Sequence, residues 1–156
     1  DCLELRVNRQ MAYTQAIKTC LRLNPKWIML SETRSKEVVY LMECLSTGVH
    51  GITTLHTSDV RKIPDRMLNM AGAERDAGRM ENDIYSFIDV GIMVRRRSET
   101  DAAGRQHIRR FIDQVCFFTR EDGINRVESI VEDGELIGDI LEQRRGTYYE
   151  TKVAVG

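Results

Sequence analysis

Two short apolar runs, separated by a helix-length segment, constrain the fold of this chain more than any other feature. Residues 27–30 read Trp-Ile-Met-Leu and lead to Glu32, and residues 52–55 read Ile-Thr-Thr-Leu and lead to His56. A strand, a helix and a second strand in this order predict two parallel strands joined by a right-handed crossover. Because ligands of open parallel sheets bind outside the carboxyl ends of the strands, we expect Glu32 and His56 at that edge.

Helices are expected on either side of the first strand. Apolar residues keep a helical spacing over residues 13–21, and Asn24-Pro25 ends that helix. A second helix is expected over residues 38–45, with Ser35 as its cap and Gly48 in the left-handed conformation past its end. The helices serve mainly to pack against the sheet.

The remaining segments of the first half are shorter or less regular. In the predicted strand at residues 26–30, the residues after Lys26 are apolar without alternation, which is typical of a strand covered on both faces. Residues 1–10 alternate apolar and charged side chains and predict a short extended segment. Further helices are expected from Pro64 and after Asp76, and the methionine-rich stripe of the first of them is predicted to belong to the core.

The second half changes to an antiparallel pattern. A strand is expected over residues 90–94 and a long one over residues 107–119, with a hairpin tip at residues 98–106 between them. Glu-Asp-Gly turns at 121–123 and 132–134 enclose a further strand. The predicted fold class is therefore α/β, with an α/β core in residues 1–75 and a helix plus an antiparallel meander in residues 76–156.

Composition excludes several function classes. The formal net charge of −1 gives no global attraction to nucleic acid or to an acidic membrane surface. The apolar runs are far shorter than the roughly 20 residues that span a bilayer, so no membrane insertion is expected. The cysteines show no C-x-x-C spacing, and Cys20 and Cys44 lie on apolar helix faces. We therefore expect buried, reduced thiols and a cytoplasmic protein.

Several short motifs follow one another in a recognisable order. Leu21-Arg22-x-x-Pro25 precedes the first strand, Ser31-Glu32-Thr33-Arg34 follows it, and Thr47-Gly48 and Thr54-Leu55-His56-Thr57 surround the second. The chain opens with Asp1-Cys2-Leu3-Glu4-Leu5. Together these residues resemble the traffic ATPases of type II and type IV secretion, especially the conjugation and tight-adherence (Flp) pilus branch. They match that family's Walker B strand, histidine box and Asp box.

The chain departs from this family at three points. Ser31 stands where the family usually has glycine, and Val49 follows Thr-Gly, so that His50 comes one place late in the histidine box. The phosphate-binding motif G-x-x-x-x-G-K-[ST] does not occur. Since the family places that loop upstream of the Asp box, the resemblance implies the carboxyl-terminal part of a RecA-like ATPase domain, inactive without the missing loop.

The resemblance implies roles for individual residues. Phosphoryl transfer needs a metal-binding acid, a group that orients the attacking water and positive groups near the phosphates. Glu32 would hold or orient the Mg²⁺ shell, and Glu4 would orient or deprotonate the attacking water. Asp1, Arg34 and His56 would contact ATP.

Alternatives remain open for three of the basic residues. His56 would bond the γ-phosphate directly or relay its presence to Glu32, or it is a neutral histidine bonded to backbone. Arg22 and Arg34 would touch the nucleotide or a neighbouring subunit, or they form carboxylate pairs within the fold, for example with Glu32 or Glu37.

The resemblance also implies partners. Family members form homo-hexamers that use ATP and Mg²⁺ to drive export or pilus assembly, so we expect a cytoplasmic protein at the inner face of a membrane, bound to membrane-embedded machinery. Arg95, Arg96 and Arg97 are expected to meet an acidic patch such as residues 128–142 of an adjacent subunit rather than nucleic acid, because aromatic residues are scarce among them. The alternative function is a non-hydrolysing interaction module that retains Glu32 and His56 as relics.

Overall fold

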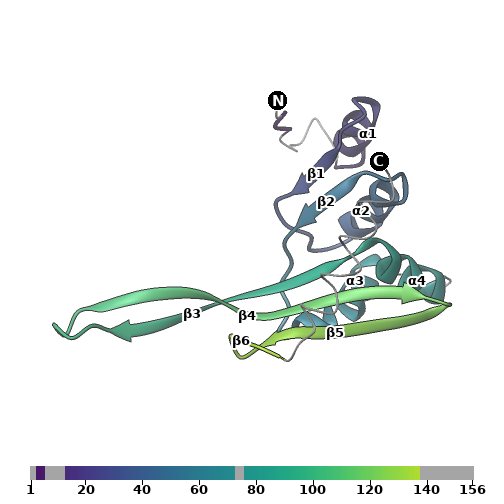
Figure 1. The fold of residues 1–156 in the computed structure, drawn as a ribbon. Coiled ribbons are helices and arrows are strands. Elements are labelled where there is room, and N and C mark those ends of the chain that lie inside the picture. Colours follow the sequence, from purple (N-terminus) through teal and green to yellow (C-terminus); the bar gives the residue numbers. More distant parts are fainter. Residues whose placement is uncertain (1–2, 6–12, 73–75, 138–156) are drawn as a thin grey trace, which may run out of the picture. The chain divides into compact units, whose positions relative to one another are not determined.

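The computed structural model of the chain describes residues 3–5, 13–72 and 76–137. They form two compact units (Figure 1), the first from the described residues of Asp1–Ser58 and Pro64–Phe87, the second from those of Asp59–Ile63 and Ile88–Gly156. The first unit mixes helices and strands, and the second is an antiparallel sheet with a short 3-10 helix. The helix after Asp76, which the sequence pattern groups with the antiparallel tail, lies in the first unit.

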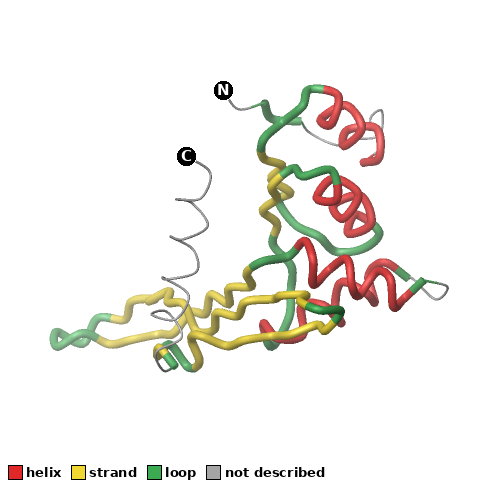
Figure 2. Tube along the Cα trace, turned by 45° about the vertical axis from the view of Figure 1, so that its right-hand side comes forward, coloured by secondary structure: helices red, strands yellow, loops and turns green. Residues whose placement is uncertain are grey.

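The first unit is built on a pair of parallel strands. Its elements are α1 (Tyr13–Arg22), β1 (Trp27–Leu30), α2 (Glu37–Ser46), β2 (His50–Thr53), α3 (Ile63–Ala71) and α4 (Ala77–Phe87). β1 and β2 pair in parallel, from Trp27 opposite His50 to Leu30 opposite Thr53. Figure 2 shows the helices beside these strands. The predicted strand, helix, strand unit is confirmed.

The core of this unit joins α1, β1 and α2. Ile17, Ile28 and Cys44 form a buried cluster, and α2 buries apolar residues at helical spacing, namely Val38, Leu41, Met42 and Leu45. Met67 and Met70 of α3 are buried as well, so the methionine-rich stripe belongs to the core, as predicted. Asn24 and Gly48 follow the two helices with φ values of 50° and 87°, which confirms the predicted helix ends.

The expectation that the first strand is covered on both faces is wrong. Ile28 is buried, but Trp27 and Met29 are 54% and 70% exposed. Successive side chains of a strand point to opposite faces. Helices of the described chain cover only the face that carries Ile28, and the apolar run reflects a strand whose second face is open in this unit.

Two local expectations also need correction. Ser35 does not cap α2, because the cap position is Lys36 and no side-chain cap bond forms there. Instead the backbone N–H of Ser35 donates to Oε2 of Glu37 at 2.8 Å. Residues 3–5 have no regular secondary structure, and the rest of the extended segment expected over residues 1–10 lies outside the described residues.

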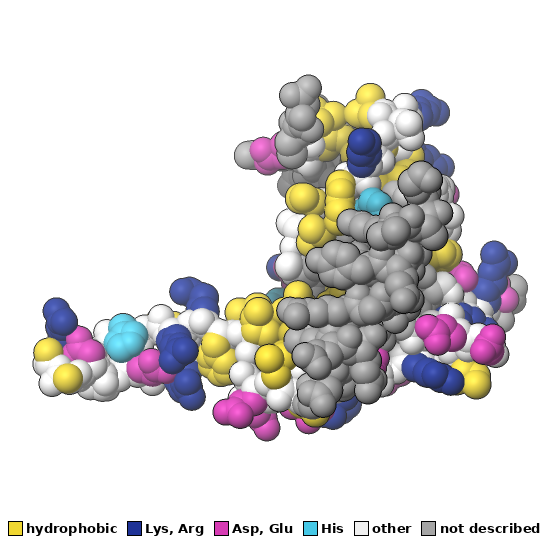
Figure 3. Space-filling model, viewed as in Figure 1, with side chains coloured by type: hydrophobic (Ala, Val, Ile, Leu, Met, Phe, Trp, Pro, Cys, Tyr) yellow, Lys and Arg dark blue, Asp and Glu magenta, His cyan; other side chains and the backbone are white. Residues whose placement is uncertain are grey.

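The second unit is an antiparallel meander, as predicted. Its elements are η1 (Val60–Lys62), β3 (Val90–Thr100), β4 (Gln106–Glu121), β5 (Ile124–Glu132) and β6 (Glu135–Leu136), with the strands in sequential order. Both Asp-Gly turns have two successive residues with positive φ, which is the geometry of tight hairpins. The hairpin tip is shorter than the expected 98–106, since the ladder continues to Thr100 opposite Gln106. Acidic and basic side chains lie close together along this hairpin (Figure 3).

The described cysteines are free thiols, as expected. Cys44 and Cys116 are buried and Cys20 is partly buried. Burial raises the pKa of the Cys44 thiol to about 11 and also raises the pKa of Cys116. Both side chains therefore remain protonated at neutral pH and act as small apolar groups in the core. Cys2 and residues 138–156 lie outside the described residues.

Replacing Gly91 by alanine should destabilise the second unit. A β-carbon at this position would lie 2.5 Å from Cγ2 of buried Val60 and 2.7 Å from Cδ1 of Ile63, so the strand or its neighbours would have to move. Overpacking of this kind costs roughly 1–3 kcal/mol. We expect a lower midpoint of urea unfolding, measured by circular dichroism.

Gly78→Ala is the matched control. Its β-carbon would meet nothing within 4 Å, and alanine is favoured over glycine in a helix. Its unfolding midpoint should stay the same or rise. Equal midpoints for Gly91→Ala and the unchanged protein would contradict the close packing of β3 on η1.

Candidate functional site

Three threonines tie together the loops that follow β1 and β2. The backbone N–H of Thr33 donates to the carbonyl oxygen of Thr54 at 2.8 Å, and the hydroxyls of Thr33 and Thr53 lie 2.8 Å apart. The Thr54 hydroxyl donates to the carbonyl oxygen of Ser31 at 2.7 Å. We call Thr33, Thr53 and Thr54 the threonine clasp. It extends the parallel pairing past the last ladder pair and holds both loops at one sheet edge.

The clasp brings Glu32, Arg34 and His56 together. Nη2 of Arg34 donates to Oε2 of Glu32 at 2.5 Å, and Nε2 of His56 lies 3.1 Å from Oε1 of the same carboxylate. The side chain of Glu32 is 21% exposed, whereas those of Arg34 and His56 are 75% and 89% exposed. A shielded carboxylate thus lies beneath two solvent-facing basic groups, and the expected meeting of Glu32 and His56 is observed.

The electrostatics of this cluster keep Glu32 ionised. The hydrogen bond from Arg34 lowers the pKa of the Glu32 carboxyl, and the charges of Arg34 and His56 lower it further, against a smaller opposing effect of desolvation. The same pair raises the pKa of Arg34. Glu32 is therefore a carboxylate at neutral pH, the form that binds a metal ion or accepts a proton.

The residues present fit a magnesium ion. Oε1 of Glu32 is buried and accepts no hydrogen bond from the described residues, and its neighbour at 3.1 Å is Nε2 of His56. A metal ion at this oxygen would therefore take the place of the exposed imidazole. No group of three or more His, Cys, Asp or Glu in the described part of the chain is arranged to hold a metal. Mg²⁺ typically takes one or two carboxylates and fills its other positions with water and substrate phosphates. Glu32 is the residue of the cluster that would hold it.

His50 occupies the opposite end of β2 from His56. It is the first residue of the strand, and its ring lies 4.9 Å from that of Trp27, centroid to centroid, with a 35° tilt. The strand runs over His50–Thr53 rather than over the expected residues 52–55, so His50 belongs to the strand itself. The ladder ends where β1 ends, because Leu30 is opposite Thr53. His56 therefore lies in the loop after the strand.

Other expected site residues lie outside this cluster or outside the described residues. Asp1 belongs to the residues that the structure does not describe, and Glu4 lies at an exposed position in residues 3–5. Arg22 is exposed in the last turn of α1. Of the alternatives open for Arg34, the carboxylate pair with Glu32 is the one observed.

Arg95, Arg96 and Arg97 belong to β3 in the second unit. Sequence patterns did not indicate the clasp, although threonine at the ends of two adjacent strands is a signal for side-chain bonds across them.

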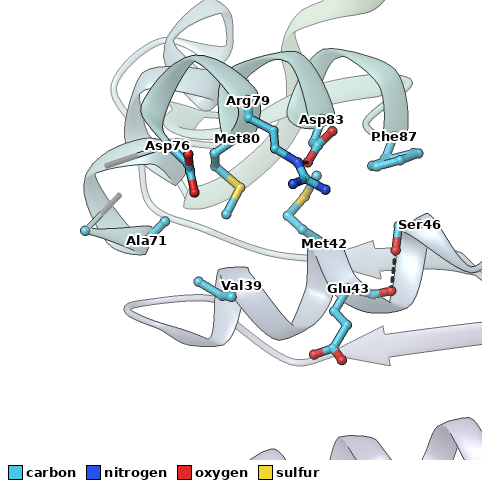
Figure 4. A pocket seen from close by; sticks show the side chains of 11 residues that line it. Val39, Met42, Glu43, Ser46, Ala71, Asp76, Arg79, Met80, Asp83 and Phe87 are labelled. Carbon is cyan, nitrogen blue, oxygen red and sulfur yellow. Dashed lines mark hydrogen bonds and ion pairs between the residues drawn. The ribbon is translucent and has the colours of Figure 1, made fainter. Parts of the chain in front are cut away.

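A groove of about 840 Å³ lies elsewhere in the first unit (Figure 4). α2, α4 and the end of α3 line it with Val39, Met42, Glu43, Ser46, Ala71, Gly72, Asp76, Arg79, Met80, Asp83 and Phe87. Its lining includes neither Glu32 nor His56. The groove is thus separate from the carboxylate cluster.

Comparisons with known proteins show the family of the chain. Residues 3–146 match the model of the family described as type II/IV secretion system protein. An uncharacterised protein of Bacillus anthracis is 32% identical over 114 residues, which cover 69% of this chain and 26% of that protein. A putative conjugal transfer protein of Mycobacterium tuberculosis is 24% identical over 148 residues, 86% of this chain and 39% of that protein.

Solved structures show a related fold. The ATPase DotB of Legionella pneumophila matches with a TM-score of 0.53 and 23% identity, over 67% of this chain and 27% of that one. DotB of Yersinia pseudotuberculosis matches with a TM-score of 0.51 and 19% identity, over 67% of this chain and 26% of that one. The chain thus spans only part of the length of these relatives. Because the family model matches nearly all of it, the chain belongs to the type II/IV secretion system protein family.

Proposed function

We propose that this chain supplies the carboxylate and histidine that act on the γ-phosphate of ATP in a secretion or conjugation ATPase. The observation that supports this most is the cluster of Glu32, Arg34 and His56 at the carboxyl ends of two parallel strands. Ligands of such sheets bind at this edge. Relatives described as ATPases and as conjugal transfer proteins favour the same role.

Glu32 is proposed to hold Mg²⁺ and to align the attacking water. Bound Mg²⁺ would neutralise charge on the β- and γ-phosphates. Within the chain, Arg34 keeps the Glu32 carboxyl ionised and bonds Oε2, so that Oε1 would be the ligand atom once His56 moves away from it. Glu4 is proposed to orient or deprotonate water, and Asp1 to contact the nucleotide.

His56 and Arg34 are proposed to respond to the γ-phosphate. Both are mostly exposed and both interact with Glu32. Exposed ion pairs contribute little to stability, so either group can exchange the carboxylate for a phosphate oxygen at small cost. Binding of the phosphate would then be coupled to the position of Glu32. Arg22 is proposed to contact the nucleotide or a neighbouring subunit.

We further propose that the complete protein is a homo-hexamer that acts at the inner face of a membrane on secretion, conjugation or pilus machinery. No helix in the described part of the chain is long and apolar enough to cross a bilayer. The competing function is a non-hydrolysing interaction module with the same fold. Turnover by the complete protein distinguishes the two.

Glu32→Gln in the complete protein should still bind ATP but not turn it over. The amide keeps the shape of the side chain and loses the charge that a metal ion and an aligned water require. We expect kcat to fall on the order of 10²–10⁴-fold with ATP affinity within a few-fold, measured by steady-state hydrolysis and equilibrium binding. Glu37→Gln is the control, because this nearby carboxylate accepts from Ser35. An unchanged kcat for Glu32→Gln would favour the interaction module.

His56→Ala should abolish hydrolysis by the complete protein, whereas His50→Ala should stay within a few-fold. Only His56 lies beside Glu32, while His50 contacts Trp27 at the other end of β2. A strand rises about 3.3 Å per residue, so the two histidines cannot reach one phosphate. The initial rate of phosphate release is the measurement. An inactive but folded His50 variant beside an active His56 variant would overturn this assignment.

Thr33→Val should reduce kcat more than it changes the KM for ATP. Valine keeps the shape of this side chain, which is 1% exposed, but removes the hydroxyl that bonds Thr53. The half-buried Thr53 hydroxyl then loses its partner, a bond worth roughly 0.5–1.5 kcal/mol, and the two loops are held less firmly. Thr33→Ser restores the bond and should recover most of the activity. If serine and valine give the same kcat, the clasp does not position Glu32.

A further inference from the structure

Beyond the reach of β5, β3 and β4 continue as a two-stranded ribbon. β5 pairs with β4 only from Val115 onward, whereas β3 and β4 stay paired as far as Thr100 and Gln106. We call residues 94–100 and 106–112 the ribbon, and in Figure 1 it extends past the ends of β5 and β6. No third strand of the described chain pairs with it. Its edges are therefore unpaired within the described chain, and Arg96, Arg97, Arg109 and Arg110 of its two faces are exposed.

One face of the ribbon neutralises its own charges. Cross-strand partners share a face, and this paired face carries Arg95, Arg97, Glu99, His107, Arg109 and Phe111. Nε of Arg97 lies 3.0 Å from Oε1 of Glu99, and Nη1 of Arg109 lies 3.7 Å from the same oxygen. Nε of Arg95 lies 2.7 Å from Oδ2 of buried Asp113. The arginines of this face thus have carboxylate partners within the chain.

The opposite face, which we call the docking face, has positive charge without acids. It carries Val94, Arg96, Ser98, Thr100, Gln106, Ile108, Arg110 and Ile112. Arg96 and Arg110 are direct cross-strand partners, and like charges in that position are unfavourable. Val94, Ile108 and Ile112 beside them are 60%, 55% and 50% exposed. Successive side chains of a strand point to opposite faces, so Arg96 lies on the docking face while Arg95 and Arg97 lie on the paired face.

The chemistry of the docking face favours a protein surface as its partner. A nucleic acid would place polar backbone against the aliphatic side chains, and no aromatic side chain stands on this face to stack with a base. An anionic membrane surface is also a poor match, because only Arg96 and Arg110 would attract it and the docking face has no tryptophan or tyrosine to lie at the membrane interface. Carboxylates beside apolar side chains would satisfy both features, since arginine bonds carboxylates strongly and the aliphatic groups become buried.

The chain itself presents such a surface at the turn between β5 and β6. Asp133 and Glu135 are exposed there, and the adjacent Leu136 and Ile137 are 65% and 37% exposed. We propose that the docking face of one copy binds the β5–β6 turn, residues 132–137, of a second copy. Arg96 and Arg110 pair with Asp133 and Glu135, while Val94, Ile108 and Ile112 pack on Leu136 and Ile137.

This contact joins two different surfaces. A copy whose docking face is occupied still has its β5–β6 turn free to bind the docking face of the next copy. Repetition of such a contact gives a closed ring or an open filament. Its place between subunits of a hexamer rests on the proposed function, but the contact itself requires neither ATP nor an intact Glu32. Association and hydrolysis can therefore fail separately.

The test is sedimentation velocity of the full-length protein without nucleotide, over a range of concentrations. Arg96→Glu/Arg110→Glu should weaken self-association at least tenfold, and Asp133→Arg/Glu135→Arg should do the same. An equimolar mixture of the two variants should associate again, because each reversed surface then meets its complement. Restored association also shows that both variants are folded.

Arg109→Glu is the matched control, since it reverses one charge of the same ribbon on the paired face. Its association should stay within about twofold of the unchanged protein, as expected for a charge outside the contact. Undiminished association of either double variant overturns the proposal, and so does a mixture that stays dissociated. Loss of binding to anionic vesicles or to duplex DNA by Arg96→Glu/Arg110→Glu, with self-association unchanged, would assign the docking face to that other partner instead.

Discussion

The site depends on the hydrogen bonds that continue the pairing of β1 and β2 beyond the last residues of the strands. A parallel two-stranded ladder of four pairs would normally let its loops diverge once the backbone bonds end. Here the Thr33 amide and the hydroxyls of Thr33, Thr53 and Thr54 continue the pairing to Thr33, three residues past β1, and to Thr54, one residue past β2. Glu32 and His56 thus emerge side by side, although 24 positions separate them in the sequence. The bond between the hydroxyls of buried Thr33 and half-buried Thr53 is directional, so it fixes register where apolar packing alone would not.

In the cluster that the clasp supports, the carboxylate is held in place and the two basic side chains can move. Glu32 is largely shielded and bonded by Arg34, while Arg34 and His56 extend into solvent. The protein loses little stability when exposed side chains of this kind change partner. The arrangement suits a site in which a phosphate or metal ion displaces one basic group from the carboxylate and leaves the backbone in place. It also explains why the carboxylate, rather than either basic residue, is held close to the sheet.

Much of this was accessible from sequence, but the decisive contacts were not. Hydrophobic periodicity and turn residues predicted the parallel unit, the meander and the shared edge of Glu32 and His56, because those depend on local pattern and chain connectivity. The second strand was predicted at residues 52–55, two residues too late, because its ladder ends at Thr53, where β1 ends. The threonine clasp depends on register, and the separation of Arg96 from Arg95 and Arg97 depends on which face of the hairpin each side chain takes. Neither follows from residue spacing without the pairing partner.

The most direct measurement is a crystal structure of the complete protein with Mn²⁺ and a non-hydrolysable ATP analogue, in which anomalous scattering locates the metal. We expect Mn²⁺ at Oε1 of Glu32, directly or through one water, and the γ-phosphate within hydrogen-bond reach of His56. The bonds of Thr33 to Thr53 and Thr54 should persist. Metal and phosphate bound elsewhere, with Glu32 still paired to Arg34 and His56, would contradict this assignment.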